Sequence, residues 1–219
     1  MEIVTVSNLH QAAKTALKKI QENYGKKNSL SIAIPGGRFG EAFTNQLLQE
    51  DIDVKYWNIF LTDERISKNK KNSVKRLIYS KVKSLKGFEE NRFFSFGGSS
   101  LKQENYINIA KTLDSINIPF FDICLLSLGE DGHLAGHFDS SILFPDQRFC
   151  YSCKASKHPP RRISFNIKFL TKSKLVILVS VGSEKTLALE KLLDGKGIHS
   201  EILNGNLNVI TDAVFRVEN

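Results

Sequence analysis

Residues 125–138, LLSLGEDGHLAGHF, combine an apolar run with glycines, acids and a histidine. Histidine has an unperturbed pKa close to neutrality, which makes His133 a candidate general base. Asp131, two residues earlier, can orient the imidazole ring or bind a hydroxyl group of a ligand. The flanking glycines leave the backbone free to approach a ligand closely. The segment therefore predicts a catalytic pair, with capping or packing as the alternative use of a single histidine.

Metal binding is a second interpretation of the same segment. His137 lies four residues after His133, and both rings face one side if a helix begins near Gly132. The HxxxH pattern lacks the glutamate of the zinc-protease motif and a third ligand. Acid–base chemistry is therefore the better supported interpretation.

The three cysteines are another candidate for metal or redox chemistry. Cys150 and Cys153 form a CxxC pattern with His158 nearby, whereas Cys124 lies in an apolar, strand-like run. An odd and low count argues against a disulfide scaffold, and no second pair completes a strong zinc pattern. Ordinary loop and strand positions are the simpler interpretation.

A glycine turn, PGGRFG (residues 35–40), follows the apolar run SLSIAI. Glycines let backbone amides approach a ligand, and the N-terminus of the helix that follows favours an anion. The turn thus suits a phosphate group at Gly36 and Gly37. It matches neither GxxxxGK[ST] nor GxGxxG, so it indicates a nucleotide only weakly, and a tight packing turn is the alternative.

A charged cluster, TDER (residues 62–65), follows the apolar run YWNIFL. Asp63 can accept a hydrogen bond from a sugar hydroxyl, and Arg65 can hold a phosphate or carboxylate through two parallel hydrogen bonds. A helix cap or a surface ion pair is the alternative.

These clusters must be positioned by elements that alternate between helical and strand-like patterns. Ser7 or Asn8 is a plausible cap for the first helix, and Gly25 ends it. Helices are expected at residues 8–24, from the glycine turn to 50, at 72–82, 101–116 and 184–193. Strands are expected at residues 29–34, 56–61, 92–96, 121–128, 163–167 and 175–182, with an irregular stretch before 163.

Several of these strands are apolar at consecutive positions, as parallel strands covered on both faces require. The predicted fold class is therefore α/β, with three layers and a mostly parallel, Rossmann-like sheet. In such sheets ligands bind beyond the carboxyl ends of the strands. Since the three polar clusters each follow a strand, we expect them to form one site.

Composition limits the class of protein. The chain has 219 residues, 41% hydrophobic and 25% charged, which is ordinary for one globular domain. Its formal net charge of +8 favours anionic partners. The N-terminus lacks an export signal and no apolar run is long enough to span a bilayer, so we expect a cytoplasmic protein. Without an RRM, KH or helix-turn-helix signature, a nucleic-acid partner is not expected.

The segment LLSLGEDGHLAGHF resembles the LGxGEDGHTASLF segment of 6-phosphogluconolactonases. In order along the chain, SIAIPGG resembles the glycine turn of that family, IFLTDER its DER strand end, PPRRISFNIKFL its PxxRITLTLxxL segment, LVILVSVGSEKTLAL its VxFLVxGxxKxxAL segment and TDAVF its closing DxAA. The similarities run in order from about Ser29 to Ala213 and cover most of the chain. Such colinearity is stronger evidence than any single motif.

The resemblance implies a single domain over residues 1–219, with the fold shared by glucosamine-6-phosphate deaminases. It implies hydrolysis of 6-phosphoglucono-1,5-lactone in the pentose phosphate pathway, with no metal and no organic cofactor. We expect a monomer without a membrane partner. His133 would activate water, assisted by Asp131. The residues expected to bind substrate and its phosphate are Gly36, Gly37, Arg38, Asp63, Arg65, Arg162 and Lys185.

Departures from the family pattern leave alternatives open. Arg38 and Phe39 stand where lactonases have Ser or Thr followed by Pro, so Arg38 either adds to phosphate binding or blocks the pocket. His137 and Asp139 replace the Leu and Pro of the ASLFP ending. The related deaminases carry a glutamate five residues after the shared histidine, where this chain has Phe138. Deamination is therefore disfavoured, and a phosphosugar sensor without catalysis is the remaining alternative.

Overall fold

The structure is a computed structural model of the chain and describes residues 1–25, 29–97, 104–204 and 206–213. The helices are α1 (Leu9–Tyr24), α2 (Gly37–Gln49), α3 (Val74–Val82), α4 (Glu104–Ser115), α5 (Ile167–Leu170) and α6 (Thr186–Leu193). The strands are β1 (Glu2–Thr5), β2 (Leu30–Ile34), β3 (Trp57–Leu61), β4 (Asp63–Arg65), β5 (Phe93–Phe94), β6 (Ile123–Ser127), β7 (Ile142–Leu143), β8 (Phe149–Ser152), β9 (Arg162–Phe165), β10 (Leu175–Ser180) and β11 (Leu207–Thr211). No helix in these ranges is long and apolar enough to cross a lipid bilayer.

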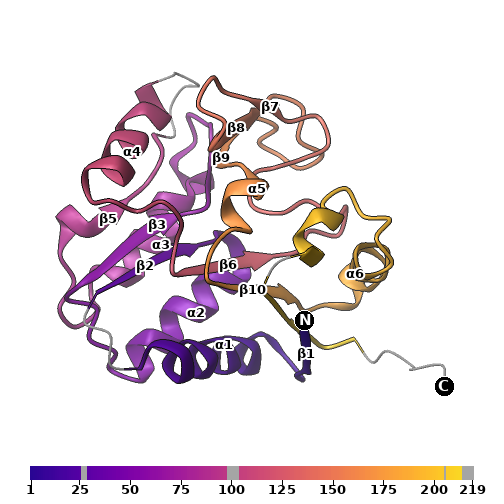
Figure 1. Cartoon of the computed structure of the whole chain (residues 1–219), viewed down its shortest axis with the longest axis horizontal. Coiled ribbons are helices and arrows are strands. Elements are labelled where there is room, and N and C mark those ends of the chain that lie inside the picture. Colours follow the sequence, from indigo (N-terminus) through magenta and orange to yellow (C-terminus); the bar gives the residue numbers. More distant parts are fainter. Residues whose placement is uncertain (26–28, 98–103, 205, 214–219) are drawn as a thin grey trace.

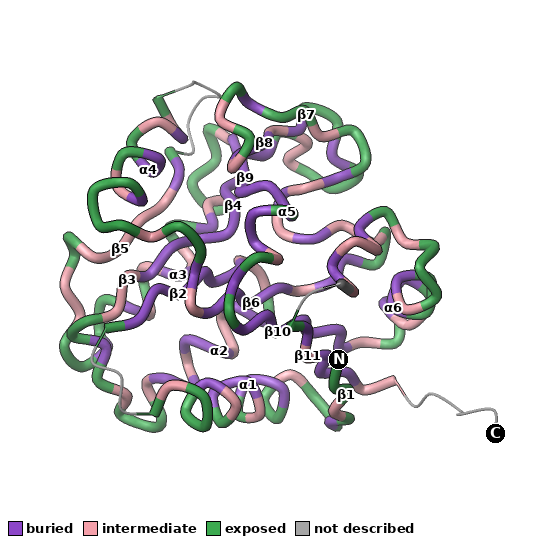
Figure 2. The backbone as a smooth tube through the Cα atoms, viewed as in Figure 1, coloured by how far each residue is buried: buried purple, intermediate pink, exposed green. Residues whose placement is uncertain are grey.

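Seven of these strands form a parallel sheet in the order β1-β11-β10-β6-β2-β3-β5. Helices α1, α2 and α3 pack on one face, and α4, α5 and α6 lie on the other (Figure 1). The strands run through the buried centre, while the outer sides of the helices are exposed (Figure 2). The predicted three-layer α/β fold is thus confirmed.

Strand β6 shows why consecutive apolar residues mark a central strand. Cys124 and Leu126 pack into the core on the α4 face, whereas Ile123 and Leu125 pack into the core on the α1 face. All four side chains are fully buried. Alternate residues of a strand point to opposite faces, so only a strand covered on both faces needs an unbroken apolar run.

Most predicted elements are present, with shifted ends. Asn8, and not Ser7, caps α1, since its side chain accepts a hydrogen bond from the backbone N–H of Gln11 at 3.0 Å. The expected start of α4 near Leu101 lies outside the described residues. Strands β1 and β11 were not predicted. β1 is a four-residue edge strand that is mostly exposed, so it lacks the buried apolar pattern.

A second sheet corrects the prediction for two segments. Strands β4, β9, β8 and β7 form an antiparallel sheet in that order. The TDER cluster, expected as a loop, forms β4, and the strand expected at 163–167 forms β9 there rather than in the parallel sheet. The stretch expected to be irregular contains β7 and β8. All four residues of β9 are buried, and a short buried run carries no signal of strand direction.

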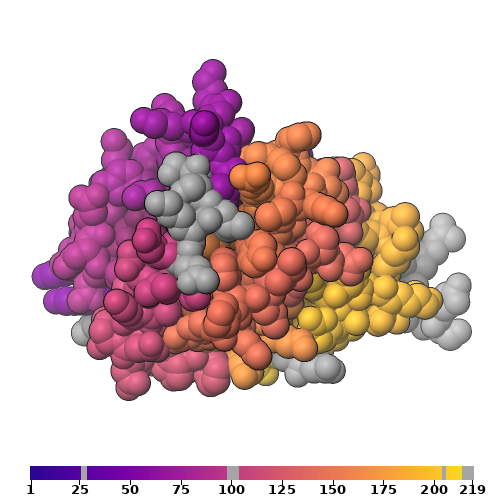
Figure 3. Space-filling view, turned by 90° about the horizontal axis from the view of Figure 1, so that it is seen from above, coloured from indigo at the N-terminus to yellow at the C-terminus, as the bar shows by residue number. Residues whose placement is uncertain are grey.

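The two halves of the chain meet in the second sheet as well as in the parallel one. In the space-filling view from above, the purple and magenta N-terminal half and the orange and yellow C-terminal half lie on opposite sides of the molecule (Figure 3). Strand β4, which follows β3, pairs with β9 from the C-terminal half, and Arg65 lies opposite Arg162 in this pairing. The pairing therefore brings two arginines together across a sequence separation that no local pattern reveals.

Glu64, the middle residue of β4, fixes the start of α3. Its fully buried carboxylate accepts hydrogen bonds from the backbone N–H groups of Arg65, Val74 and Lys75 at 2.7 to 2.8 Å and from the Ser73 hydroxyl at 3.0 Å. Burial raises the pKa of this carboxyl group, and the hydrogen bonds oppose that shift. A carboxylate at a helix N-terminus also interacts favourably with the helix dipole. Glu64 therefore has a structural role.

We predict that Glu64→Gln lowers the free energy of unfolding by about 2 to 3 kcal/mol. The amide NH₂ of glutamine would face N–H groups whose hydrogen bonds a carboxylate oxygen now accepts. Urea unfolding at neutral pH measures the change. Glu41→Gln is the control, since it removes only an exposed ion pair with Lys81 at 3.5 Å and should cost less than about 1 kcal/mol. Equal losses for the two variants would contradict this role.

Candidate active site

Four neighbouring strands of the parallel sheet, β10, β6, β2 and β3, deliver polar residues to one edge. β2 and β6 are direct neighbours. The chain leaves these two strands toward opposite faces of the sheet: α2, which follows β2, packs on one face, and Leu134, which follows β6, packs on the other. Such a divergence opens a crevice at the carboxyl ends of the strands.

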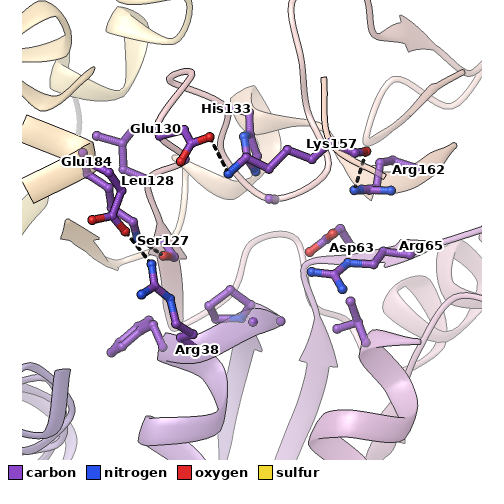
Figure 4. A pocket seen from close by; sticks show the side chains of 18 of the residues that line it. Arg38, Asp63, Arg65, Ser127, Leu128, Glu130, His133, Lys157, Arg162 and Glu184 are labelled. Atoms are coloured by element: carbon purple, nitrogen blue, oxygen red, sulfur yellow. Dashed lines mark hydrogen bonds and ion pairs between the residues drawn. The ribbon is translucent and has the colours of Figure 1, made fainter. Parts of the chain in front are cut away.

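A pocket of about 230 Å³ lies at this edge (Figure 4). Its walls come from residues that precede, form or follow all four strands, and from the segment between β8 and β9. The predicted site residues that line it are Gly36, Gly37, Arg38, Asp63, Arg65, His133, Arg162 and Lys185. The structure thus brings eight of the nine together, and the ninth, Asp131, contacts the His133 ring from outside the lining.

His133 and Asp131 form a hydrogen-bonded pair. Asp131 Oδ1 contacts Nδ1 of the His133 ring and also accepts from the His133 backbone N–H at 3.3 Å. A proton on Nδ1 that is shared with the carboxylate leaves Nε2 as the free basic nitrogen. Burial disfavours the charged carboxylate, but hydrogen bonds from Ser156 and His133 outweigh it and lower the pKa of Asp131 to about 2. Asp131 is therefore an anion at any physiological pH.

The backbone around this pair is a tight turn, which corrects the expectation of a helix near Gly132. The N–H of Gly129 donates to the carbonyl of His133 at 2.9 Å, and the N–H of Gly132 donates to the carbonyl of Gly129 at 3.0 Å. Gly132 has a φ of +86°, which L-residues with side chains rarely adopt. A Cβ on Gly129 would overlap the His133 ring. Both glycines therefore serve to bring the ring into place.

Phe138 packs against one face of the His133 ring. The two rings stack with centroids 4.3 Å apart at 19°. The guanidinium of Arg162 lies 5.8 Å from the centroid of the Phe138 ring, at a distance typical of a cation–π contact. Arg162 also donates to the backbone carbonyl of Lys157 at 3.2 Å. Arg162 therefore contacts both the ring that stacks on His133 and the neighbouring loop.

One end of the pocket holds Asp63, Arg65 and Arg162 (Figure 4). Burial raises the pKa of Asp63, and the Thr62 hydroxyl, Arg162 and Arg65 oppose that shift. Burial lowers the pKa of the Arg162 guanidinium, which remains charged because arginine titrates far above neutrality. Two arginines and one carboxylate leave this end of the pocket with a positive balance.

The other end holds Lys185, Arg38 and Glu184. Lys185 is only 9% exposed and its Nζ donates to the Ser127 hydroxyl at 3.2 Å. Burial lowers the pKa of this ammonium group. Arg38 Nη2 pairs with Glu184 Oε1 at 2.6 Å, and both side chains are largely exposed (Figure 4). Arg38 thus lies at the rim, where Glu184 holds it.

The glycine turn forms the start of α2. Gly36 is the N-cap, makes no side-chain cap hydrogen bond, and is followed by Gly37 with a φ of +69°. A Cβ on Gly36 would overlap Val74 of α3, so this turn also packs tightly. The first backbone N–H groups of α2 lie in the pocket wall, where an anion is favoured.

The pocket also contains residues that the sequence did not assign to it: Ser127, Leu128, Glu130, Lys157 and Glu184 among others. His158, which the sequence suggested only as a metal ligand beside the CxxC pattern, lines the pocket as well. Lys157 pairs with Glu130 at 2.9 Å beside His133 (Figure 4). Lys157 lies on the loop before the PPRR segment, which the sequence placed in an irregular stretch. Only the position of that loop against residues 129–133 brings Lys157 into the site.

The metal and redox interpretations gain no geometric support. Within the described residues, no group of three or more His, Cys, Asp or Glu side chains could hold a metal ion. Cys150 is buried in β8, whereas Cys153 is exposed. The His137 ring lies against the His199 ring, with centroids 4.7 Å apart at 53°, and its Nδ1 accepts from the backbone N–H of Ile167 at 3.3 Å.

Comparison with known proteins agrees with this geometry. Residues 6–203 match the family described as glucosamine-6-phosphate isomerases/6-phosphogluconolactonase. A 6-phosphogluconolactonase of Borreliella burgdorferi is 32% identical over 178 residues, which cover 78% of this chain and 76% of that protein. The crystal structure of a 6-phosphogluconolactonase from Thermotoga maritima superposes with a TM-score of 0.84 at 19% identity, covering 96% and 98% of the two chains. A monomeric glucosamine-6-phosphate deaminase superposes with a TM-score of 0.74 at 18% identity, covering 96% and 97%.

Fold, site and sequence agree on the class: the chain belongs to the glucosamine-6-phosphate isomerase/6-phosphogluconolactonase family. Within that family it is a hydrolase of the 6-phosphogluconolactonase type.

Half-buried His137, which packs against buried His199, makes the free energy of unfolding depend on pH. Burial lowers the pKa of His137 to about 4, with His199 contributing, and burial also lowers the pKa of His199. Between pH 6.5 and 4 the unfolded chain binds a proton at His137 that the folded chain does not, so the free energy of unfolding falls as the pH falls.

We predict a loss of roughly 2 kcal/mol from His137 between pH 7 and pH 5, measured by urea unfolding at both values. His137→Asn should be less stable at pH 7 but show a smaller loss on acidification. His10→Asn, on the exposed side of α1, should keep the full dependence. An unchanged pH dependence in His137→Asn would contradict this assignment.

Proposed function

We propose that this protein hydrolyses 6-phosphoglucono-1,5-lactone to 6-phosphogluconate, with His133 as the general base. The observation that carries this proposal is the Asp131–His133 pair, whose imidazole lines a pocket that also presents Arg65, Arg162 and Lys185. A histidine base and a set of cations match a neutral lactone ring that carries a phosphate group. The hydrolase class and the lactonase relatives support the same reaction.

In the proposed mechanism, Nε2 of His133 removes a proton from a water molecule as that water attacks the lactone carbonyl carbon. Asp131 accepts a hydrogen bond from Nδ1 and stabilises the imidazolium ion that forms. Positive groups of the pocket stabilise the oxyanion of the tetrahedral intermediate. The intermediate then expels the ring oxygen, which takes up the proton as a hydroxyl group, and the product acid ionises.

Two anionic groups need cations in this pocket: the phosphate would be held by the N-terminal amides of α2 at Gly36 and Gly37 together with Lys185, and the oxyanion of the intermediate by Arg65 and Arg162 at the other end. Burial of Lys185 and Arg162 favours these roles, since partly desolvated cations gain most from a charged partner. Asp63 would accept a hydrogen bond from a sugar hydroxyl. Arg38 would add to phosphate binding if the phosphate displaces Glu184 from its guanidinium.

Phe138 supports hydrolysis over the isomerising deamination of related enzymes. It occupies the position where the sequence comparison with deaminases expects a glutamate, and its ring stacks on His133. An apolar ring cannot transfer a proton, so this position offers no second acid or base beside His133. A monomeric state, a cytoplasmic location and action of residues 1–219 as one domain stay predictions.

The purified protein should accelerate hydrolysis of freshly generated 6-phosphogluconolactone above the spontaneous rate, and a chelator should leave the rate unchanged. We predict that His133→Ala lowers kcat by about 10²-fold or more, because it removes the imidazole that would activate the water. A pH-stat assay that follows acid release measures both rates.

His10→Ala is the control for this assay and should keep the parent rate, since His10 lies on the exposed side of α1. Near-normal turnover by His133→Ala would remove His133 from the role of base. No acceleration by the parent protein, together with binding of 6-phosphogluconate, would instead establish a phosphosugar sensor.

Lys185→Met should raise KM about tenfold or more and weaken binding of 6-phosphogluconate to a similar extent, with a smaller effect on kcat, because it removes a phosphate contact and keeps the side-chain volume. Steady-state kinetics and calorimetric titration measure the two constants. Lys191→Met, on the exposed side of α6, should change neither. Unchanged product affinity in Lys185→Met would mean that the phosphate binds elsewhere.

A further inference from the structure

Ser156, on the loop between β8 and β9, lies against the catalytic pair. Its hydroxyl donates a hydrogen bond to Asp131 Oδ2, the carboxylate oxygen that does not contact Nδ1 of His133. The two oxygens of Asp131 are thus engaged on opposite sides, one by the imidazole ring and one by the serine. A carboxylate held at both oxygens has a fixed plane, and this plane sets the direction of the histidine ring.

The loop that carries Ser156 is itself held against the catalytic turn. The adjacent Lys157 pairs with Glu130, the residue next to Asp131, at 2.9 Å. Consecutive residues of one loop therefore contact consecutive residues of the other. Arg162 fixes the loop from within the pocket by donating to the Lys157 carbonyl at 3.2 Å. Ser156 is thus presented to Asp131 by a supported backbone, even though its side chain is exposed.

We propose that Ser156 is a positioning residue for lactone hydrolysis, which holds Asp131 in the orientation that keeps the His133 proton on Nδ1 and leaves Nε2 free to act as the base. This inference rests on the proposed function. Ser156 touches neither water nor lactone in this role and acts only through Asp131. Loss of its hydroxyl should let the carboxylate rotate and the ring sample orientations in which Nε2 no longer faces the substrate.

The test is a double-mutant cycle on lactone hydrolysis. Ser156→Ala should lower kcat roughly tenfold, the size expected when a hydrogen bond to a charged group is lost, and leave KM within about twofold. In an Asp131→Asn background the same substitution should have almost no further effect on kcat, because the group through which Ser156 acts is already altered. Full multiplication of the two effects would overturn the proposal.

Two controls separate positioning from general loosening of the loop. Ser156→Thr keeps a hydroxyl and should retain most of the activity, whereas Ser156→Val has a similar shape without it and should behave like Ser156→Ala. Ser152→Ala removes a hydroxyl at the start of the same loop, which bonds to the Ser140 hydroxyl and accepts from the N–H of Lys154. Because this hydroxyl does not act through Asp131, any effect of Ser152→Ala on kcat should multiply with that of Asp131→Asn. Equal activity of the Thr and Val variants would also overturn the proposal.

A measurement independent of turnover distinguishes failure of this inference from failure of the proposed function. ¹⁵N NMR of labelled histidine, with the His133 signal assigned by its loss in His133→Ala, reports which ring nitrogen carries the proton. The parent and Ser156→Thr should show Nδ1 protonated and Nε2 free, and Ser156→Ala should show a mixture. An inactive parent protein would reject the lactonase function, but the spectrum would still decide the role of Ser156. Identical spectra for all variants would overturn that role.

Discussion

The site depends on the parallel pairing of β2 with β6. Ile32 and Ala33 pair with Ile123 and Cys124, and the chain then leaves the two strands toward opposite faces of the sheet. This divergence places the start of α2 opposite the turn that carries His133, with the ends of β3 and β10 on either side. Strands buried on both faces make this frame rigid, which allows glycine-rich turns to be positioned accurately at its edge.

The second sheet adds to the pocket an arginine and a loop that the parallel sheet does not provide. The pairing of β4 with β9 places Arg65 beside Arg162, and the loop between β8 and β9 lies against the turn that carries His133. Concentrating cations in a partly buried pocket opposes folding, because like charges repel and burial removes their water. Glu184 and Glu130 offset part of that cost at the rim, while the inner cations keep an excess positive charge for an anionic ligand.

The parts of the fold and site that could be predicted are those whose physical cause is local. The unbroken apolar run around Leu125 predicts a central parallel strand, and the glycines at 36 and 37 predict the turn before α2. The direction of β9 could not be predicted, since four buried residues look alike in either direction. Glu64 reads as part of a ligand motif, and its role as the cap of α3 depends on where Val74 and Lys75 lie.

The sequence alone determined the chemical groups and their order: a histidine two residues after an aspartate, glycines at the turns, and basic residues near the strand ends. Backbone freedom and side-chain chemistry are properties of the residues themselves, so they are visible before folding. Only the tertiary structure decided which nitrogen of His133 faces Asp131, that His137 turns instead to His199, and that the loop at Ser156 reaches the carboxylate. These contacts join segments far apart in the chain, and their geometry is set by how the two sheets pack.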